Sequence, residues 1–309
     1  MPVELTRLGK HNLTVFSPVM PSAGTVGFGD EYSHLIKFDK LGAFVTSPIT
    51  FKARRVARGN NVVPLPGGML LHTGLPNPGV HKVIKQARKV WEGMPVPVIV
   101  HVMGTIPPEV RRCVRALVES PAVQGIELGI HDLASAEETA ALIETVTETT
   151  QLPVLVRVPL DRAIELAPVV AASQAGAIVV GSSPRGLARD SLSGQMISGR
   201  LYGPLVMPQA LRMVAQVVQF VAGEDLPVIG CGGIHSAQDA RDFIEVGARA
   251  VQLDSVIWTR PGLAEIIARD LAGLELTRPT DAYPDEWFPG IGETDRKKSS
   301  PPRPSKLPD

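Results

Sequence analysis

The chain has 309 residues, is 44% hydrophobic and carries 31 basic and 31 acidic side chains, so its formal net charge is zero. A chain of this length can bury a large core, as one large α/β domain or as two ordinary ones. The balanced charge gives no indication of a nucleic-acid partner or of an anionic membrane surface.

Eight short runs rich in β-branched residues are predicted to be strands. Most of them are nearly continuous apolar stretches, which is typical of parallel strands covered on both faces. In chain order they span residues 17–24, 43–50, 97–104, 125–132, 153–159, 177–182, 227–233 and 250–255.

Segments of helical period lie between these runs. The segment at 135–150 opens with Ser135 and Glu138, which have the spacing of a capping box. Ser236 can cap the helix that follows the seventh strand. The predicted helices span residues 80–92, 107–120, 135–150, 161–174, 207–222, 236–247 and 261–273.

Eight strands alternating with helices within about 250 residues is the count of a (β/α)8 barrel, and a doubly wound open sheet is the alternative. We predict an α/β fold, a TIM barrel with an N-terminal strand extension, over residues 1–275. Residues 276–309 are rich in proline and charge and have no period, so we expect an irregular, partly disordered tail. Its aromatic half, around Trp287, either shares that disorder or packs on the barrel or on a partner protein.

The seventh and eighth strands end in a pattern that suits an anion. The segment PVIGCGGIHS runs into Gly232 and Gly233, and the eighth strand ends in Asp254 and Ser255. In many barrels these two strand ends form a phosphate site, because glycines let backbone N–H groups approach oxygen and a serine adds a hydroxyl. We predict a phosphate site here, and the alternative is that the glycines only relieve a tight turn.

Five segments together resemble the class 1 dihydroorotate dehydrogenases, flavin enzymes on a (β/α)8 barrel. The resemblance runs from about Leu5 to Gly273. It is carried by SPVMPSAGTVGFGDEY, KLGAFVTSPIT, PGGMLLHTGLPNPGV, GPLVMPQALRMVAQV and LPVIGCGGIHSAQDARDFIEVGARAVQLDS. The resemblance implies FMN as cofactor. The residues that it implicates are Gly203, Gly232, Gly233, Asp254 and Ser255 at the phosphate, and Ser22, Ala23 and Gly24 along the flavin ring.

The chain differs from this family at positions where the family binds its substrate and flavin. A lysine near the flavin is replaced by Ser47, and the lysine of the fifth strand is replaced by Arg157. The loop that carries the family's catalytic base is shortened to DLASAEE, in which Ser135 is better explained as a helix cap. Asparagines that contact orotate are replaced by Leu71, Gly129 and Gly181, and the serine of the family's NxSCPN pattern is replaced by His131.

These losses argue against dihydroorotate as substrate. Each polar group left unpaired in a dry pocket costs roughly 1–3 kcal/mol, so the loss of three amides sacrifices most of the affinity for orotate. Without the base, no group accepts the proton when a C–H bond is broken by hydride transfer. We predict that the chain does not oxidise dihydroorotate.

Histidines and an arginine occur where the amides are missing. Strand alternation places His101, His131 and Arg157 on the barrel-facing side, and His72 follows Leu71. They can bind an anion, transfer protons, ligate a metal or merely fill space, and no HxH or HxxxH spacing supports a metal. Arg157 is the best candidate for stabilising an anionic flavin or a substrate carboxylate, because a guanidinium keeps its proton. We predict Arg157, His131 and His101 as catalytic residues and no metal site.

Asp254 conflicts with a phosphate beside it. A glycine is usual at this position in the resembling family, and a carboxylate repels a phosphate. Two orientations are open: the side chain points out of the site and only its N–H serves, or it faces the phosphate and weakens FMN binding.

We therefore expect an FMN-dependent oxidoreductase acting on a different, anionic small molecule. The alternative is a non-catalytic relative with an assembly or regulatory role. The resemblance also implies a homodimer, and the tail is a candidate contact for a protein partner.

The segment MPVELTRLGKHN lacks a signal-peptide core, no apolar run reaches the ~18 residues of a membrane span, and Cys113 and Cys231 have no metal-ligand spacing, so we expect a cytoplasmic protein with reduced thiols.

Overall fold

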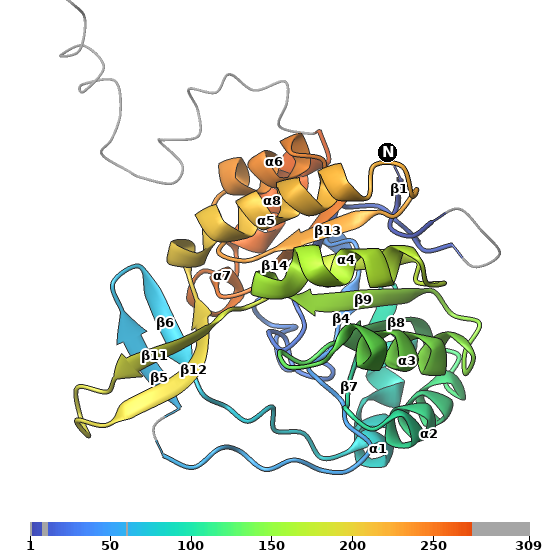
Figure 1. Ribbon diagram of the computed structural model, residues 1–309, viewed down its shortest axis with the longest axis horizontal. Coiled ribbons are helices and arrows are strands. Elements are labelled where there is room, and N and C mark those ends of the chain that lie inside the picture. The colour runs from blue at the N-terminus through green and yellow to red at the C-terminus, as the bar shows by residue number, and fades with distance from the viewer. Residues whose placement is uncertain (1, 8–11, 60, 274–309) are drawn as a thin grey trace, which may run out of the picture. The chain divides into compact units, whose positions relative to one another are not determined.

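The computed structural model describes residues 2–7, 12–59 and 61–273, and residues Met1–Ala272 form one compact unit (Figure 1). The predicted tail from residue 276 lies outside the described residues, so the boundary near residue 275 stays a prediction.

Eight parallel strands form the central sheet, and each strand lies beside the barrel strands that precede and follow it in the chain. Their order is β3, β14, β13, β10, β9, β8, β7, β4. The N–H of Gly42 donates to the carbonyl of Val19 (2.7 Å), which joins the segments of β3 and β4 and closes the sheet into a (β/α)8 barrel. A doubly wound sheet is thereby excluded. The strands are β3 (Val19–Pro21), β4 (Phe44–Val45), β7 (Val98–Met103), β8 (Val123–Gly129), β9 (Val154–Pro159), β10 (Ala177–Ser182), β13 (Val228–Cys231) and β14 (Ala250–Leu253).

Helices pack around the outside of the barrel (Figure 1). All seven predicted helices are present, and Ser135 forms the predicted capping box. The segment after β3 is the exception: it is rich in glycine and contains only a short 3-10 helix, Phe38–Lys40. The α-helices are α1 (Val80–Glu92), α2 (Pro107–Val118), α3 (Ala136–Thr147), α4 (Ala163–Ala171), α5 (Met207–Phe220), α6 (Ala237–Glu245), α7 (Val256–Thr259) and α8 (Leu263–Leu271).

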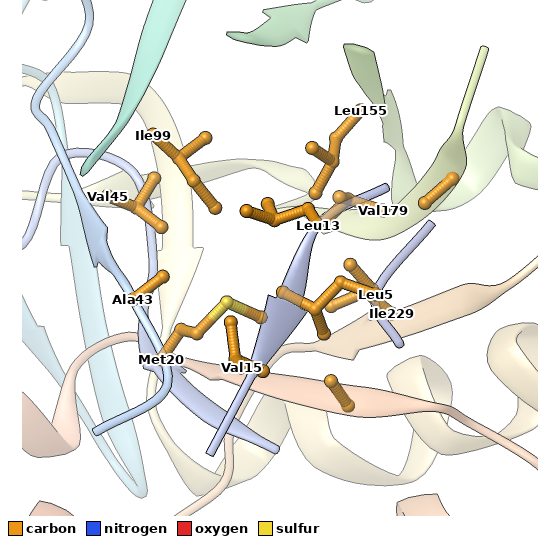
Figure 2. Close-up of a cluster of buried hydrophobic side chains, with 12 residues drawn as sticks. Leu5, Leu13, Val15, Met20, Ala43, Val45, Ile99, Leu155, Val179 and Ile229 are labelled. Atoms are coloured by element: carbon orange, nitrogen blue, oxygen red, sulfur yellow. The ribbon is translucent and has the colours of Figure 1, made fainter. Parts of the chain in front are cut away.

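A two-stranded hairpin precedes the barrel and contributes to its core. It pairs β1 (Val3–Glu4) with β2 (Thr14–Val15). Leu5, Leu13 and Val15 are buried in one cluster with inward-facing side chains of the barrel strands, as Figure 2 shows. The N-terminal extension therefore packs against the apolar part of the barrel interior.

A second sheet of four antiparallel strands is inserted in the loops of the barrel, and the sequence did not indicate it. Its order is β11, β12, β6, β5. In Figure 1 these strands lie together to one side of the helices. They are β5 (Val62–Leu65), β6 (Gly68–Leu71), β11 (Arg185–Arg189) and β12 (Met196–Tyr202).

Among the helices that the structure describes, none has the length and apolar character needed to cross a membrane.

Candidate functional site

A layer of polar side chains crosses the barrel interior next to the apolar cluster. His101, Arg157 and Gln252 each lie two residues beyond a cluster member on the same strand. Because side chains two apart in a strand share a face, these three point into the barrel. Glu127 of β8 and Ser22, which follows β3, complete the layer, and all five residues are buried.

Hydrogen bonds connect this layer across the barrel. Glu127 accepts at Oε1 from the His101 ring at Nδ1 (2.8 Å) and at Oε2 from the Gln252 amide (2.6 Å). The Arg157 guanidinium donates to Gln252 Oε1 (2.5 Å) and Ser22 Oγ (2.9 Å), and lies 3.6 Å from the Glu127 carboxylate. It also donates to the carbonyl of Gly181 (2.7 Å). The layer is thus an internally paired network.

The network keeps Glu127 ionised. Burial by itself raises the pKa of a carboxyl group, but the hydrogen bond from His101 and the charge of Arg157 outweigh it and hold the pKa of Glu127 below its ordinary value. The pKa of Arg157 is raised, because the charge of Glu127 is among the effects that outweigh burial. One buried anion and one buried cation therefore compensate each other.

A cavity of about 580 Å³ opens at the carboxyl ends of the strands, where barrel enzymes carry their active sites. Ala23 and Gly24, two of the residues predicted along a flavin ring, line it together with Ser47 and His131. His101 and Arg157 are not among its lining residues. The three predicted catalytic residues thus lie at two levels: His131 at the cavity and His101 with Arg157 in the buried layer.

The charged side chains that line the cavity are predominantly basic. Lys52, Arg54, Arg185 and Arg200 stand against two carboxylates, giving a net charge of +2 with histidines neutral (+4 − 2). Asp132 pairs with both Arg185 (2.5 Å) and Arg200 (2.9 Å). Although burial acts to raise the pKa of Asp132, these two arginines lower it overall. One carboxylate shared by two guanidinium groups leaves a positive charge uncompensated.

The second carboxylate that lines the cavity, Glu109, is paired with Lys52 (2.6 Å). Among the ion pairs of the described residues, none involves Arg54, whose Nε donates to the carbonyl of Gly74. His131 accepts at Nδ1 from the N–H of Leu133 (3.3 Å), so the hydrogen of the neutral ring is on Nε2. Two further donors to an anion are therefore available near the cavity.

Two positions of the missing asparagines are closed by their neighbours. A Cβ at Gly129 would lie 2.7 Å from His101 Nε2 and 2.6 Å from Met103 Sδ. A Cβ at Gly181 would lie 2.4 Å from the Cβ of Cys231. The third position, Leu71, lines the cavity with an apolar side chain. The imidazole of His101 has taken the space at Gly129.

The predicted phosphate site brings its residues together. Gly233 and Ser255, from the ends of β13 and β14, meet at the side chain of Asp254. A Cβ at Gly233 would lie 2.8 Å from the carbonyl oxygen of Gly203 and one at Gly232 would lie 2.9 Å from Ala210, so these glycines also permit close packing against the start of α5. Asp254 is 1% exposed, and its carboxylate points toward the N–H groups of Gly233 and Ser255 and not out of the predicted site. That these residues hold a phosphate stays a prediction.

Glu127 and Gln252 are site residues that sequence reasoning missed. Glu127 is the single charged side chain of β8, Gln252 is the single amide of β14, and each has barrel-facing parity. That combination was the available signal. Among the described residues, no group of three or more His, Cys, Asp or Glu side chains that could hold a metal ion is found. The absence of a metal site stays a prediction.

Comparison with known proteins identifies relatives along most of the chain. The family model described as dihydroorotate dehydrogenase matches residues 9–274. The chain is similar to the catalytic subunit of dihydroorotate dehydrogenase B (NAD(+)) of Desulforudis audaxviator, with 35% identity over 276 residues that cover 84% of this chain and 89% of that protein. The subunit of the same name from Trichlorobacter lovleyi is 32% identical over 277 residues, with 84% and 90% covered. The chain therefore belongs to the dihydroorotate dehydrogenase family, a family of FMN-binding flavoprotein oxidoreductases.

Proposed function

We propose that this protein is an FMN-dependent oxidoreductase that acts on a small anionic molecule other than dihydroorotate. The observation that carries the proposal is the cavity at the barrel mouth. Four cationic side chains and two carboxylates line it, and no asparagine or glutamine is among its described lining residues.

The charge of the cavity supports an anionic substrate. The end formed by Asp132, Arg185 and Arg200 has one more cation than anion, and Arg200 is largely shielded from solvent, with 19% of its side chain exposed. A guanidinium binds carboxylate or phosphate oxygens in bidentate geometry, and partial burial strengthens that interaction. We place the anionic group of the substrate beside Arg200 and His131.

The absence of amides argues against a pyrimidine ring. Dihydroorotate and orotate present ring N–H and C=O groups, and each needs a partner in a closed pocket. At Gly129 and Gly181, the neighbouring side chains leave no room for an asparagine. The restoration of either amide would require a rearrangement of the barrel interior.

The buried layer has a positioning role in this proposal. FMN, when bound, supplies the acceptor for a hydride. The Arg157 guanidinium donates to four partners, so its positive charge is held in a fixed position beside Ser22, which precedes Ala23 and Gly24 of the cavity in the chain. Glu127 fixes the orientation of the His101 ring through Nδ1, so that Nε2 lies toward Gly129.

The test is anaerobic reduction of the flavin-loaded protein, followed at 450 nm. We expect no bleaching by L-dihydroorotate and bleaching by a member of a panel of small carboxylates. Arg200→Gln should weaken that substrate about tenfold or more, because a charge-assisted pair is lost. Arg212→Gln, which changes an exposed arginine of α5 outside the cavity, should not. Bleaching by L-dihydroorotate would contradict the proposal.

The second candidate is a non-catalytic member of the family with an assembly or regulatory role. The β11–β12 hairpin favours it, because Leu187 and Leu192 are 64% and 91% exposed there and exposed apolar side chains suit a protein contact. A protein that binds flavin but is reduced by no compound of the panel would favour this candidate.

A further inference from the structure

The carboxylate of Asp254 lies among the hydrogen-bond donors at the ends of β13 and β14. It accepts from the N–H of Gly233 (3.3 Å) and from the N–H of Ser255 (2.5 Å). The hydroxyl of Ser255 also donates to it (3.0 Å). These are the N–H and hydroxyl donors from which the sequence predicts a phosphate site.

This carboxylate has no cationic partner among the ion pairs of the described residues, although Asp254 is 1% exposed. A buried carboxylate needs compensation, and here two backbone N–H groups and one hydroxyl provide it. Neutral hydrogen-bond donors converge on one negative group, as they do in an anion-binding site that holds its anion.

We propose that the Asp254 carboxylate takes the place of the FMN phosphate, so that this chain binds flavin through its ring and gains no affinity for FMN over riboflavin from the phosphate. The residues of the predicted phosphate site fit a carboxylate supplied by the chain and do not fit a second anion. The ring end, with Ala23 and Gly24 on the cavity, is unaffected.

Two physical reasons exclude a second anion from this site. The N–H of Gly233 and that of Ser255 each provide one hydrogen, and both are already directed at the carboxylate. A phosphate in contact with the same donors would also stand within a few ångströms of a negative charge in a dry environment, where repulsion is strong.

The experiment compares the affinities of FMN and riboflavin by the quenching of flavin fluorescence in the wild type, Asp254→Gly and Asp225→Gly. In the wild type we expect FMN to bind no more tightly than riboflavin, because the carboxylate repels the phosphate. In Asp254→Gly, FMN should bind at least about tenfold tighter than in the wild type, because the donors are released and the repulsion is removed, while riboflavin should change less than about twofold. Asp225→Gly, which removes an exposed carboxylate at a positive φ of 48°, should behave as the wild type.

Asp254→Asn provides an independent check, because it removes the charge without shortening the side chain. It should raise the FMN to riboflavin preference relative to the wild type. A wild type that prefers FMN tenfold or more would overturn the proposal. So would an Asp254→Gly variant that gains no FMN affinity, including one that binds neither flavin. The readout is binding without turnover, so this proposal and the proposed substrate class can fail separately.

Discussion

Glu127 determines whether the polar layer is a stable part of the barrel. Its two oxygens accept from His101 and Gln252, and its charge balances that of Arg157 in a fully buried setting. A buried pair of this kind adds modest net stability when it is complete, but the removal of one partner leaves the other charge unpaired. The residue is therefore structurally required whether or not it takes part in a reaction.

We expect Glu127→Gln to lower the free energy of unfolding by about 3 kcal/mol. The NH2 group of the new glutamine would face a hydrogen-bond donor of His101 or Gln252, and Arg157 would lose its counter-charge. Urea unfolding measures this. The control is Glu148→Gln, whose pair with Arg111 is exposed and should change stability by less than about 1 kcal/mol. Equal losses in the two variants would contradict the network described for the layer.

The same carboxyl group predicts a pH dependence. The pKa of Glu127 is lowered by folding, so its contribution to stability is present above the unfolded value of about 4.3 and is lost as the pH falls through the folded value. In urea titrations between pH 7 and pH 3, the wild type should lose more stability than Glu127→Gln in the acidic range. If the stability of the two proteins falls equally as the pH is lowered, groups other than Glu127 cause the acid sensitivity.

At the level of elements, α3 shows how local sequence determines a helix boundary. Ser135 accepts from the N–H of Glu138 (3.1 Å), and the Glu138 carboxylate accepts from the N–H of Ser135 (2.8 Å). Two donors at the start of the helix are satisfied by side chains, so the helix begins at Ala136. In the family that the chain resembles, the loop before this point delivers the catalytic base, whereas here its last residue serves as a cap.

Ser135→Ala should lower the free energy of unfolding by about 1 kcal/mol, because the N–H of Glu138 loses its acceptor. Substrate-dependent flavin reduction should remain unchanged, since Ser135 is not among the lining residues of the cavity. Ser191→Ala, in the exposed turn between β11 and β12, is the matched control for stability. A loss of turnover in Ser135→Ala with stability unchanged would instead identify a catalytic serine.

At the level of the whole molecule, the barrel has an apolar part and a polar part. The apolar part is filled by the cluster of Figure 2, to which the N-terminal hairpin contributes Leu5, Leu13 and Val15. The polar part leads to the cavity. The hairpin thus belongs to the core of the domain, although it precedes the first barrel strand.

Leu13→Ala should therefore destabilise the protein by about 2–4 kcal/mol, as large-to-small changes do in packed cores. The control is Leu133→Ala, because Leu133 is 87% exposed and its removal should change stability by less than about 0.5 kcal/mol. Differential scanning calorimetry measures both. A Leu13→Ala variant as stable as the wild type would mean that the hairpin does not contribute to the stability of the barrel core.

The sequence predicted the barrel because its strands are buried on both faces and therefore read as apolar runs of the correct number. It did not predict β5, β6, β11 and β12, which are short and whose residues are mostly exposed or half-buried. At the site, strand parity correctly placed His101 and Arg157 inside the barrel. Strand parity predicts the face on which a side chain lies, but not its depth along the barrel or its partners. Only the structure shows that both residues pair with Glu127 and where the Asp254 carboxylate points.

The polar layer also bears on how the strands align along one another. His101, Arg157 and Gln252 come from three strands, and their contacts form only at one relative offset of those strands. Sliding β9 by two residues would keep its parity but move Arg157 into the apolar cluster, with an unpaired charge that costs several kcal/mol. We expect this penalty to favour one shear of the barrel over its neighbours. The residues of the buried polar layer would then also set the number of residues by which the sheet is staggered when it closes.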